Sequence, residues 1–200
     1  MAYSYTNRQG KIHYFKRAET KKGGYRYYVT TSNKFPDLID EVPNDYEVAE
    51  LPEDAKVVIR KKKPVLITKE EREITHDAIK DFSAINDFFI HADEEYVYVY
   101  HSQFNYTAGQ EPNLSREEAN EVFGFGEDVT RWMRFFTSLR FKLVDKTKRL
   151  FQTERVVYTS FYGHDFHPVG EVGLIEDVAR NYGQYLGRET FFDLEPKSYE

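Results

Sequence analysis

Residues 88–101 decide the fold, and they read Phe-Phe-Ile-His-Ala-Asp-Glu-Glu-Tyr-Val-Tyr-Val-Tyr-His. Two β-forming runs, 88–91 and 96–101, flank a turn-forming acidic run at 93–95. Tyrosine alternates with valine in the second run, so the tyrosines share one face of a strand and the valines share the other. The pattern predicts a β-hairpin.

Three further pairs of β-forming runs surround short polar turns in the same way. They are residues 11–18 with 25–31, 46–49 with 56–60, and 139–144 with 150–160. The first two pairs precede Pro64, which punctuates the chain. We therefore expect a small antiparallel β module at residues 1–64.

Helical signals follow after Pro64. Thr68 and Glu71 have the spacing of a capping box, in which each side chain bonds the other's backbone at a helix N-terminus. Further helices are expected after Ser115, after Asp128 and after Pro168. The second of these three would extend through Phe136, and the third would end near Gly187. The sequence predicts an α+β fold, with residues 65–200 forming a larger domain of β-hairpins packed by three to four helices.

The composition excludes several classes of chemistry. The 200 residues include no cysteine, which rules out disulfides, thiolate zinc sites, iron–sulfur clusters and a cysteine nucleophile. No run approaches the ~18–20 apolar residues that span a bilayer, and the first residues lack the apolar core of a signal peptide. We expect a cytoplasmic protein that has no membrane association.

The net charge of −6 conceals blocks of opposite sign. Residues 1–35 contain eight basic side chains and one acidic one, whereas residues 36–59 contain eight acidic side chains and one basic one. Four basic residues then follow at 60–63. Such blocks are typical of solvated faces, but they can also form a binding surface for a charged partner.

The two ends of the chain resemble a family of uncharacterised bacterial proteins. The similarity lies in a Tyr-, Lys- and Gly-rich β module at the start and in a Gly-Arg-Glu-x-Phe-Phe ending, carried by residues 14–28, 39–48, 57–61 and 186–194. These motifs are structural. The resemblance implies neither an activity nor the role of any residue.

Cations and aromatic rings alternate in the first predicted hairpin. Cations neutralise phosphates and rings stack on bases, so this mixture is typical of nucleic-acid contact. An ordinary half-buried hairpin with its aromatic side chains in a core gives the same pattern. The candidate nucleic-acid-binding residues are Lys16, Arg17, Lys21, Lys22, Tyr25 and Arg26.

The densest cluster of potential catalytic groups is His164, Asp165 and His167, between Gly163 and Pro168. Two imidazoles and a carboxylate on a turn could hold a divalent cation that activates water. A complete site needs a third ligand, and His91, Asp93 or His101 would have to supply it. Histidine and aspartate in turns also commonly bond to the backbone, so the cluster alone specifies no metal.

Other catalytic motifs are absent from the sequence. It contains no Gly-x-Ser-x-Gly elbow, no phosphate-binding loop and no dinucleotide fingerprint, so we expect no cofactor. The sequence favours a non-enzymatic binding protein that engages a protein partner through a Tyr- and Arg-rich surface. The alternatives are nucleic-acid binding through the first hairpin and metal-assisted hydrolysis by the His/Asp cluster.

Overall fold

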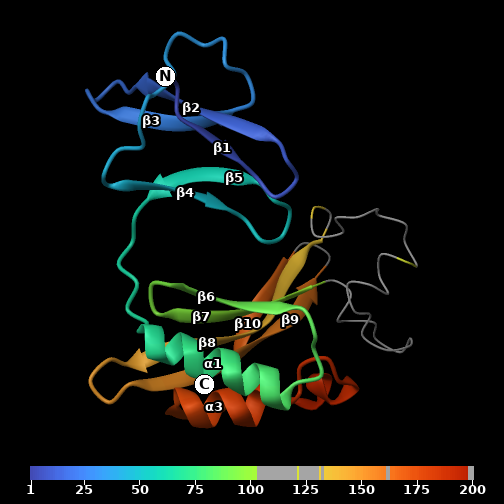
Figure 1. Ribbon diagram of the computed structural model, residues 1–200. Helices are drawn as coiled ribbons and strands as arrows, with labels where there is room; N and C mark the ends of the chain where they lie inside the picture. Colours follow the sequence, from blue (N-terminus) through green and yellow to red (C-terminus); the bar gives the residue numbers. More distant parts are fainter. Residues whose placement is uncertain (103–120, 122–130, 132, 161–162, 198–200) are drawn as a thin grey trace. The chain divides into compact units, whose positions relative to one another are not determined.

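The computed structural model describes residues 1–102, 121, 131, 133–160 and 163–197. The chain folds as two compact units (Figure 1). The N-terminal unit contains Met1–Lys63, with Arg131, Met133 and Arg134 from later in the chain. The C-terminal unit contains the other described residues. Each unit has its own hydrophobic core.

The N-terminal unit is built from two small antiparallel sheets (Figure 1). One sheet has the order β1-β2-β3, and the other pairs β4 with β5. The strands are β1 (Ser4–Thr6), β2 (Ile12–Glu19), β3 (Tyr25–Thr30), β4 (Tyr46–Glu50) and β5 (Val57–Lys61). Phe15, Ile39 and Val57 are buried together in the core, so side chains alternate along β2 between this core and the outer face of its sheet.

The C-terminal unit contains a five-stranded antiparallel meander in the order β10-β9-β8-β7-β6. Neighbours in the sheet are neighbours in the order of strands along the chain, and each pair is antiparallel. The strands are β6 (Phe88–Asp93), β7 (Tyr96–Ser102), β8 (Phe135–Asp145), β9 (Leu150–Ser160) and β10 (Gly163–Leu174).

Helices cover one face of this sheet (Figure 1). They are α1 (Lys69–Phe82) and α3 (Ile175–Gly183), followed by the short 3-10 helix η3 (Glu189–Asp193). The valines of β7, Val97 and Val99, are fully buried with Ile79 of α1 and Ala179 of α3. The tyrosines of β7 therefore belong to the opposite face, which we call the outer face.

The predicted capping box of α1 is confirmed. The backbone N–H of Glu71 donates to Thr68 Oγ1 at 3.2 Å, and the backbone N–H of Thr68 donates to Glu71 Oε2 at 2.9 Å. The four predicted hairpins are also present, as β2–β3, β4–β5, β6–β7 and β8–β9. The α+β class holds in its coarse form, as antiparallel sheets with helices.

The helix predictions need correction. The part of the chain that the structure describes contains two α-helices rather than three or four. Phe136 lies in β8 and not in a helix, because the alternation of buried and exposed side chains begins there. The helix expected after Ser115 lies outside the described residues. The helix expected after Pro168 is present as α3, which begins at Ile175, and Pro168 itself lies inside β10.

Strand β10 forms one edge of the sheet, where a proline removes no inter-strand hydrogen bond that a neighbour requires. Its pairing with β9 is interrupted between Val169 and Gly173. Gly170 has φ +62°, and a Cβ there would lie 1.5 Å from Tyr182 Oη, so only glycine fits. Among the described helices none has the length and apolar character needed to cross a membrane.

Candidate functional site

The half of the β2–β3 hairpin that lies next to its turn, residues 17–26, extends beyond the core of its unit. Arg17, Ala18 and Glu19 on β2 and Tyr25 and Arg26 on β3 are all exposed. The turn that joins the strands is held by its backbone, with Thr20 N–H donating to the Gly24 carbonyl at 2.7 Å. Gly23 adopts φ +78°, a conformation that glycine takes without strain. The turn therefore presents Lys21 and Lys22 to solvent without using their side chains.

Strand register assigns the six candidate residues to three places. Lys16 lies opposite Tyr28, and Arg26 lies opposite Ala18, so Lys16 and Arg26 share the outer face of the hairpin. Arg17 and Tyr25 lie on the other face, where the guanidinium carbon is 5.0 Å from the ring centroid. Lys21 and Lys22 lie in the turn. The six residues are therefore distributed over both faces and the turn of the hairpin.

Exposed aromatic rings accompany these cations. Tyr25, Tyr28 and Phe35 have 46%, 44% and 41% of their surface exposed. The Lys16 ammonium lies 4.3 Å from the centroid of the Phe35 ring. Phe35 therefore lies beside the face of the hairpin that carries Lys16. The hairpin thus presents three partly exposed rings together with its cations.

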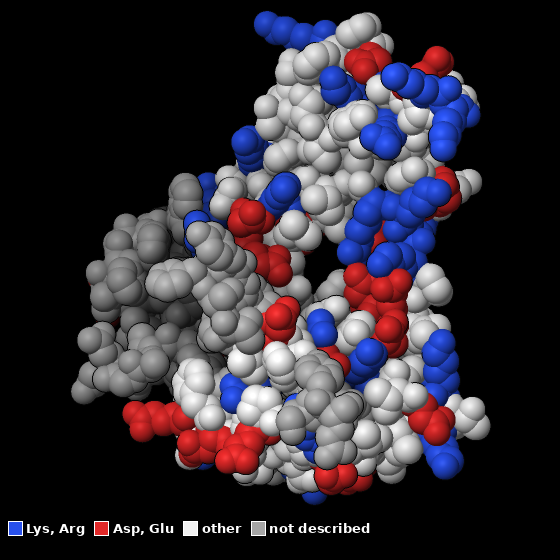
Figure 2. Space-filling view, turned by 180° about the vertical axis from the view of Figure 1, so that it is seen from behind, with Lys and Arg blue, Asp and Glu red and all other residues white. Residues whose placement is uncertain are grey.

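The charges of the hairpin are uncompensated. Within the described residues, none of Lys16, Arg17, Lys21, Lys22 and Arg26 forms an ion pair. Arg8 and Arg60 of the same unit differ, since they pair with Glu50 and Glu47. Residues 1–63 contain thirteen basic and nine acidic side chains. Basic side chains accordingly cover more of this unit than acidic ones on the face shown in Figure 2.

A second surface lies on the outer face of the five-stranded sheet. Tyr96, Tyr98 and Tyr100 form a ladder along β7, with ring centroids 5.7 and 6.1 Å apart. The Arg140 guanidinium lies 4.4 Å from the Tyr96 centroid and 4.1 Å from that of Phe166. All three tyrosines are half-buried, and burial raises the pKa of Tyr98. This tyrosine ladder corresponds to the Tyr- and Arg-rich surface that the sequence predicts.

The His/Asp cluster has a different geometry from the predicted turn. His164, Asp165 and His167 lie in strand β10, opposite Tyr158, Val157 and Arg155 of β9. The register is continuous from 164 to 167, so positions three apart belong to opposite faces of the sheet. Asp165 is exposed and His167 is half-buried. Positions 164 and 167 therefore do not lie on the turn that the predicted site requires.

The residues expected to complete that metal site lie elsewhere. His91 and Asp93 belong to β6, at the opposite edge of the sheet from β10, and four strand spacings amount to about 19 Å. His101 lies in β7, about 14 Å from β10. His101 is also buried, where desolvation lowers its pKa to about 4. Within the described part of the chain, no three histidine, aspartate or glutamate side chains are grouped to hold a metal ion.

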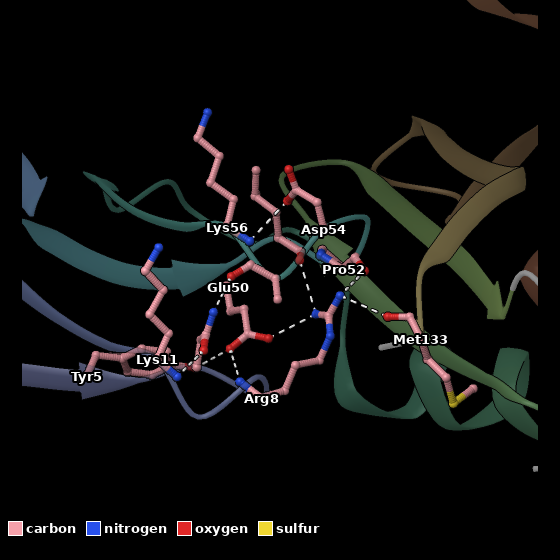
Figure 3. A network of polar contacts seen from close by, with 11 residues as sticks. Tyr5, Arg8, Lys11, Glu50, Pro52, Asp54, Lys56 and Met133 are labelled. Atoms are coloured by element: carbon pink, nitrogen blue, oxygen red, sulfur yellow. Dashed lines mark hydrogen bonds and ion pairs between the residues drawn. The ribbon is translucent and has the colours of Figure 1, made fainter. Parts of the chain in front are cut away.

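The N-terminal unit contains a network of polar contacts that no sequence pattern predicts (Figure 3). Arg8 Nη1 donates to Glu50 Oε1 at 2.9 Å, and Glu50 Oε2 accepts from the Arg8 backbone N–H at 3.0 Å and from Tyr5 Oη at 3.3 Å. Arg8 Nη2 also donates to the Met133 carbonyl at 3.2 Å. The partners are up to 125 positions apart in sequence, so no local motif predicts these contacts.

Known proteins provide no guide to this chain, because no protein-family model, curated protein or solved structure matches it. The function is therefore argued from the two surfaces alone.

Proposed function

We propose that the protein binds single-stranded nucleic acid through the β2–β3 hairpin. The observation that carries the proposal is the set of five cations that form no ion pair with another described residue, next to the exposed rings of Tyr25, Tyr28 and Phe35. Unpaired bases stack on such rings, at about 1–3 kcal/mol per base, while cations follow the backbone. The half-buried tyrosine ladder offers less accessible ring surface than these three side chains.

The electrostatic part of this binding depends on salt. Each phosphate contact to a single strand releases condensed counterions, with a slope of about −0.7 per contact in log K against log salt. Five hairpin cations therefore give a slope of about −3.5 if all of them contact phosphate. The net negative charge of the whole chain favours a local contact at the hairpin over coating by the entire surface.

Replacing Lys21 and Lys22 with glutamate is expected to abolish most binding, because it reverses two charges at the hairpin tip. The affinity for a fluorescent single-stranded oligonucleotide should fall by about tenfold or more at low salt, and the salt slope should become shallower by about 1.4. Fluorescence anisotropy of DNA and RNA probes measures both quantities. The fold is retained, since the backbone of Thr20, Gly23 and Gly24 holds the turn.

The matched control is Lys146→Glu with Lys148→Glu. These exposed lysines occupy the β8–β9 turn, so the control changes the net charge equally at another hairpin tip. We expect it to bind with nearly wild-type affinity. Equal loss in both double variants, or undiminished binding by the Lys21/Lys22 variant, contradicts a site on the β2–β3 hairpin.

The tyrosine ladder favours a second candidate function, a protein-binding surface on the outer face of the five-stranded sheet. Tyrosine and arginine are enriched among the residues that dominate interface energy. Tyr96→Ala removes the ring that both Arg140 and Lys142 approach. Affinity purification of tagged protein from its native cells should then lose a protein that the Lys21/Lys22 variant still retains. Recovery of the same proteins with both variants argues against this surface.

A further inference from the structure

A groove of about 510 Å³ opens in the N-terminal unit, away from the hairpin tip. It lies among the start of β2, the end of β3 and the segment that leads into β5. Its polar lining includes Lys11, His13, Thr30, Thr31, Asp54 and Lys56. We propose that this groove is a binding site for a phosphate group, carried by a small phosphorylated ligand or by the end of a nucleic-acid strand.

Two lysines supply the positive charge of the groove. Lys11 and Lys56 are exposed, and neither forms an ion pair with another described residue. Their backbones are fixed, because Lys11 N–H donates to Asn7 Oδ1 at 2.9 Å and Lys56 N–H donates to Asp54 Oδ1 at 3.0 Å. Figure 3 shows both side chains extending in the same direction, away from the Arg8–Glu50 pair. An anion that binds between the two ammonium groups gains two cationic contacts, and both lysines are attached to a fixed backbone.

His13 supplies an unused hydrogen-bonding group. Its side chain lines the groove from β2 and is 8% exposed, and its Nε2 has no hydrogen-bond partner within the described part of the chain. A buried polar atom without a partner is unfavourable, so such an atom indicates a partner that arrives with a ligand. A phosphate oxygen, or a water that it holds, completes the bonding of this nitrogen.

One acidic group close to the groove, Glu50, is paired with a cation. Both carboxylate oxygens of Glu50 are engaged by Arg8, and Tyr5 adds a further bond. Asp54 is the acidic side chain among the groove residues, and it accepts the backbone N–H of Lys56. Lys11, Lys56 and Asp54 together give the lining a charge of +1, which favours an anion over a cation.

Two charged groups act on His13, namely Lys11, which precedes β2, and Glu50 on β4. Tyr5 lies opposite His13 on β1, and Asp54 and Lys56 line the same groove. Desolvation, followed by Lys11, lowers the pKa of His13. A phosphate dianion between the lysines opposes the effect of Lys11. Occupation of the groove is therefore expected to raise the His13 pKa.

The experiment follows the His13 ring resonances of the full chain by NMR across pH, at constant ionic strength. The probes are inorganic phosphate, a nucleoside 5′-monophosphate, and a short single strand with or without a 5′-phosphate. We expect saturable shifts of His13 and an upward shift of its pKa with the phosphate-bearing probes. Preference for the monophosphate identifies a small ligand, and preference for the 5′-phosphorylated strand identifies a strand end.

Lys11→Met with Lys56→Met should weaken phosphate binding by about tenfold or more, since each charged contact contributes a factor of that order. Lys34→Met with Lys62→Met removes equal charge from the same unit and should leave binding unchanged. Lys21→Glu with Lys22→Glu should leave this site intact, because the tip lies at the other end of β2 and β3. This last variant separates the groove from the proposed hairpin function. A non-saturating response of His13, or equal weakening in the two methionine variants, overturns the proposal.

Discussion

Acidification from about pH 6.5 to pH 4 is expected to destabilise the folded protein by about 3 kcal/mol through His101 alone. The side chain is 2% exposed, and both ring nitrogens are engaged. Nε2 lies 2.8 Å from Ser138 Oγ, and Nδ1 lies 3.3 Å from the Ser102 carbonyl oxygen. The neutral ring satisfies both contacts, with Nδ1–H donating to the carbonyl and Nε2 accepting from the hydroxyl.

The direction of the effect follows from the two pKa values. Desolvation lowers the folded-state pKa of His101 to about 4, whereas the unfolded chain keeps a value of about 6.5. Between these values the unfolded state binds a proton that the folded state does not. The free energy of unfolding is therefore unaffected by His101 above about pH 6.5, falls as the pH decreases, and levels off below about pH 4.

Urea unfolding of the wild type and of His101→Gln measures this contribution. Glutamine retains hydrogen-bonding groups but does not titrate, so the stability of the variant should decline less over the same pH range. The carboxylates contribute equally to both proteins, and they cancel in the difference. His76→Gln is the control, because its side chain is 49% exposed and should behave as the wild type. Parallel curves for wild type and His101→Gln would contradict a depressed pKa at this position.

Replacing Glu71 with alanine is expected to lower the free energy of unfolding by about 3 kcal/mol. This buried carboxylate accepts from Arg149 Nε at 2.8 Å and from Arg149 Nη2 at 2.5 Å, and it also caps α1 through Thr68. The substitution leaves the partly buried Arg149 guanidinium without its carboxylate partner and the Thr68 backbone N–H without its acceptor. It therefore disconnects the start of α1 from the β8–β9 turn.

Graded variants separate the two roles of Glu71. Glu71→Gln keeps the acceptor for Thr68 but loses the charge, so its loss of stability should be smaller than that of alanine. Glu70→Ala is the matched control, because Glu70 lies exposed in the same helical turn. Chemical denaturation of all three proteins provides the measurement. Equal losses for Glu70→Ala and Glu71→Ala would show that helix-dipole charge, rather than the Arg149 pair, explains the effect.

Local patterns predicted the elements whose stability is local. The Thr68–Glu71 spacing marks a helix start, and alternation from Tyr96 to Tyr100 marks a strand with one buried face, so both were readable from the sequence. Strand β10 was missed because Gly163, Pro168 and Gly170 are typical of turns. An edge strand tolerates these residues, since one side of it needs no partner, and only the tertiary fold shows which strand lies at an edge.

The candidate surfaces were predictable to different extents. The cations of the β2–β3 hairpin are local in sequence, and the hairpin itself places them together. The phosphate groove is different, because Asn7, His13 and Lys56 come from separate elements and share a lining only after the two sheets pack. The position of the proposed third metal ligand also depends on strand order, which hairpin patterns do not specify. In the observed order, His91 lies on the opposite edge strand from His167.

The interrupted edge of β10 also bears on self-association. A regular, exposed edge strand is a template for aggregation, since its free backbone groups pair with a strand from another molecule. Here Pro168 lacks an N–H, and its carbonyl accepts the Lys197 N–H at 2.8 Å, while Val169 bridges to Pro196. The bulge at Gly170 then bends the remaining length away from a straight register. The glycine and proline residues that make β10 resemble a turn in sequence also disfavour the pairing of its edge with a strand of another molecule.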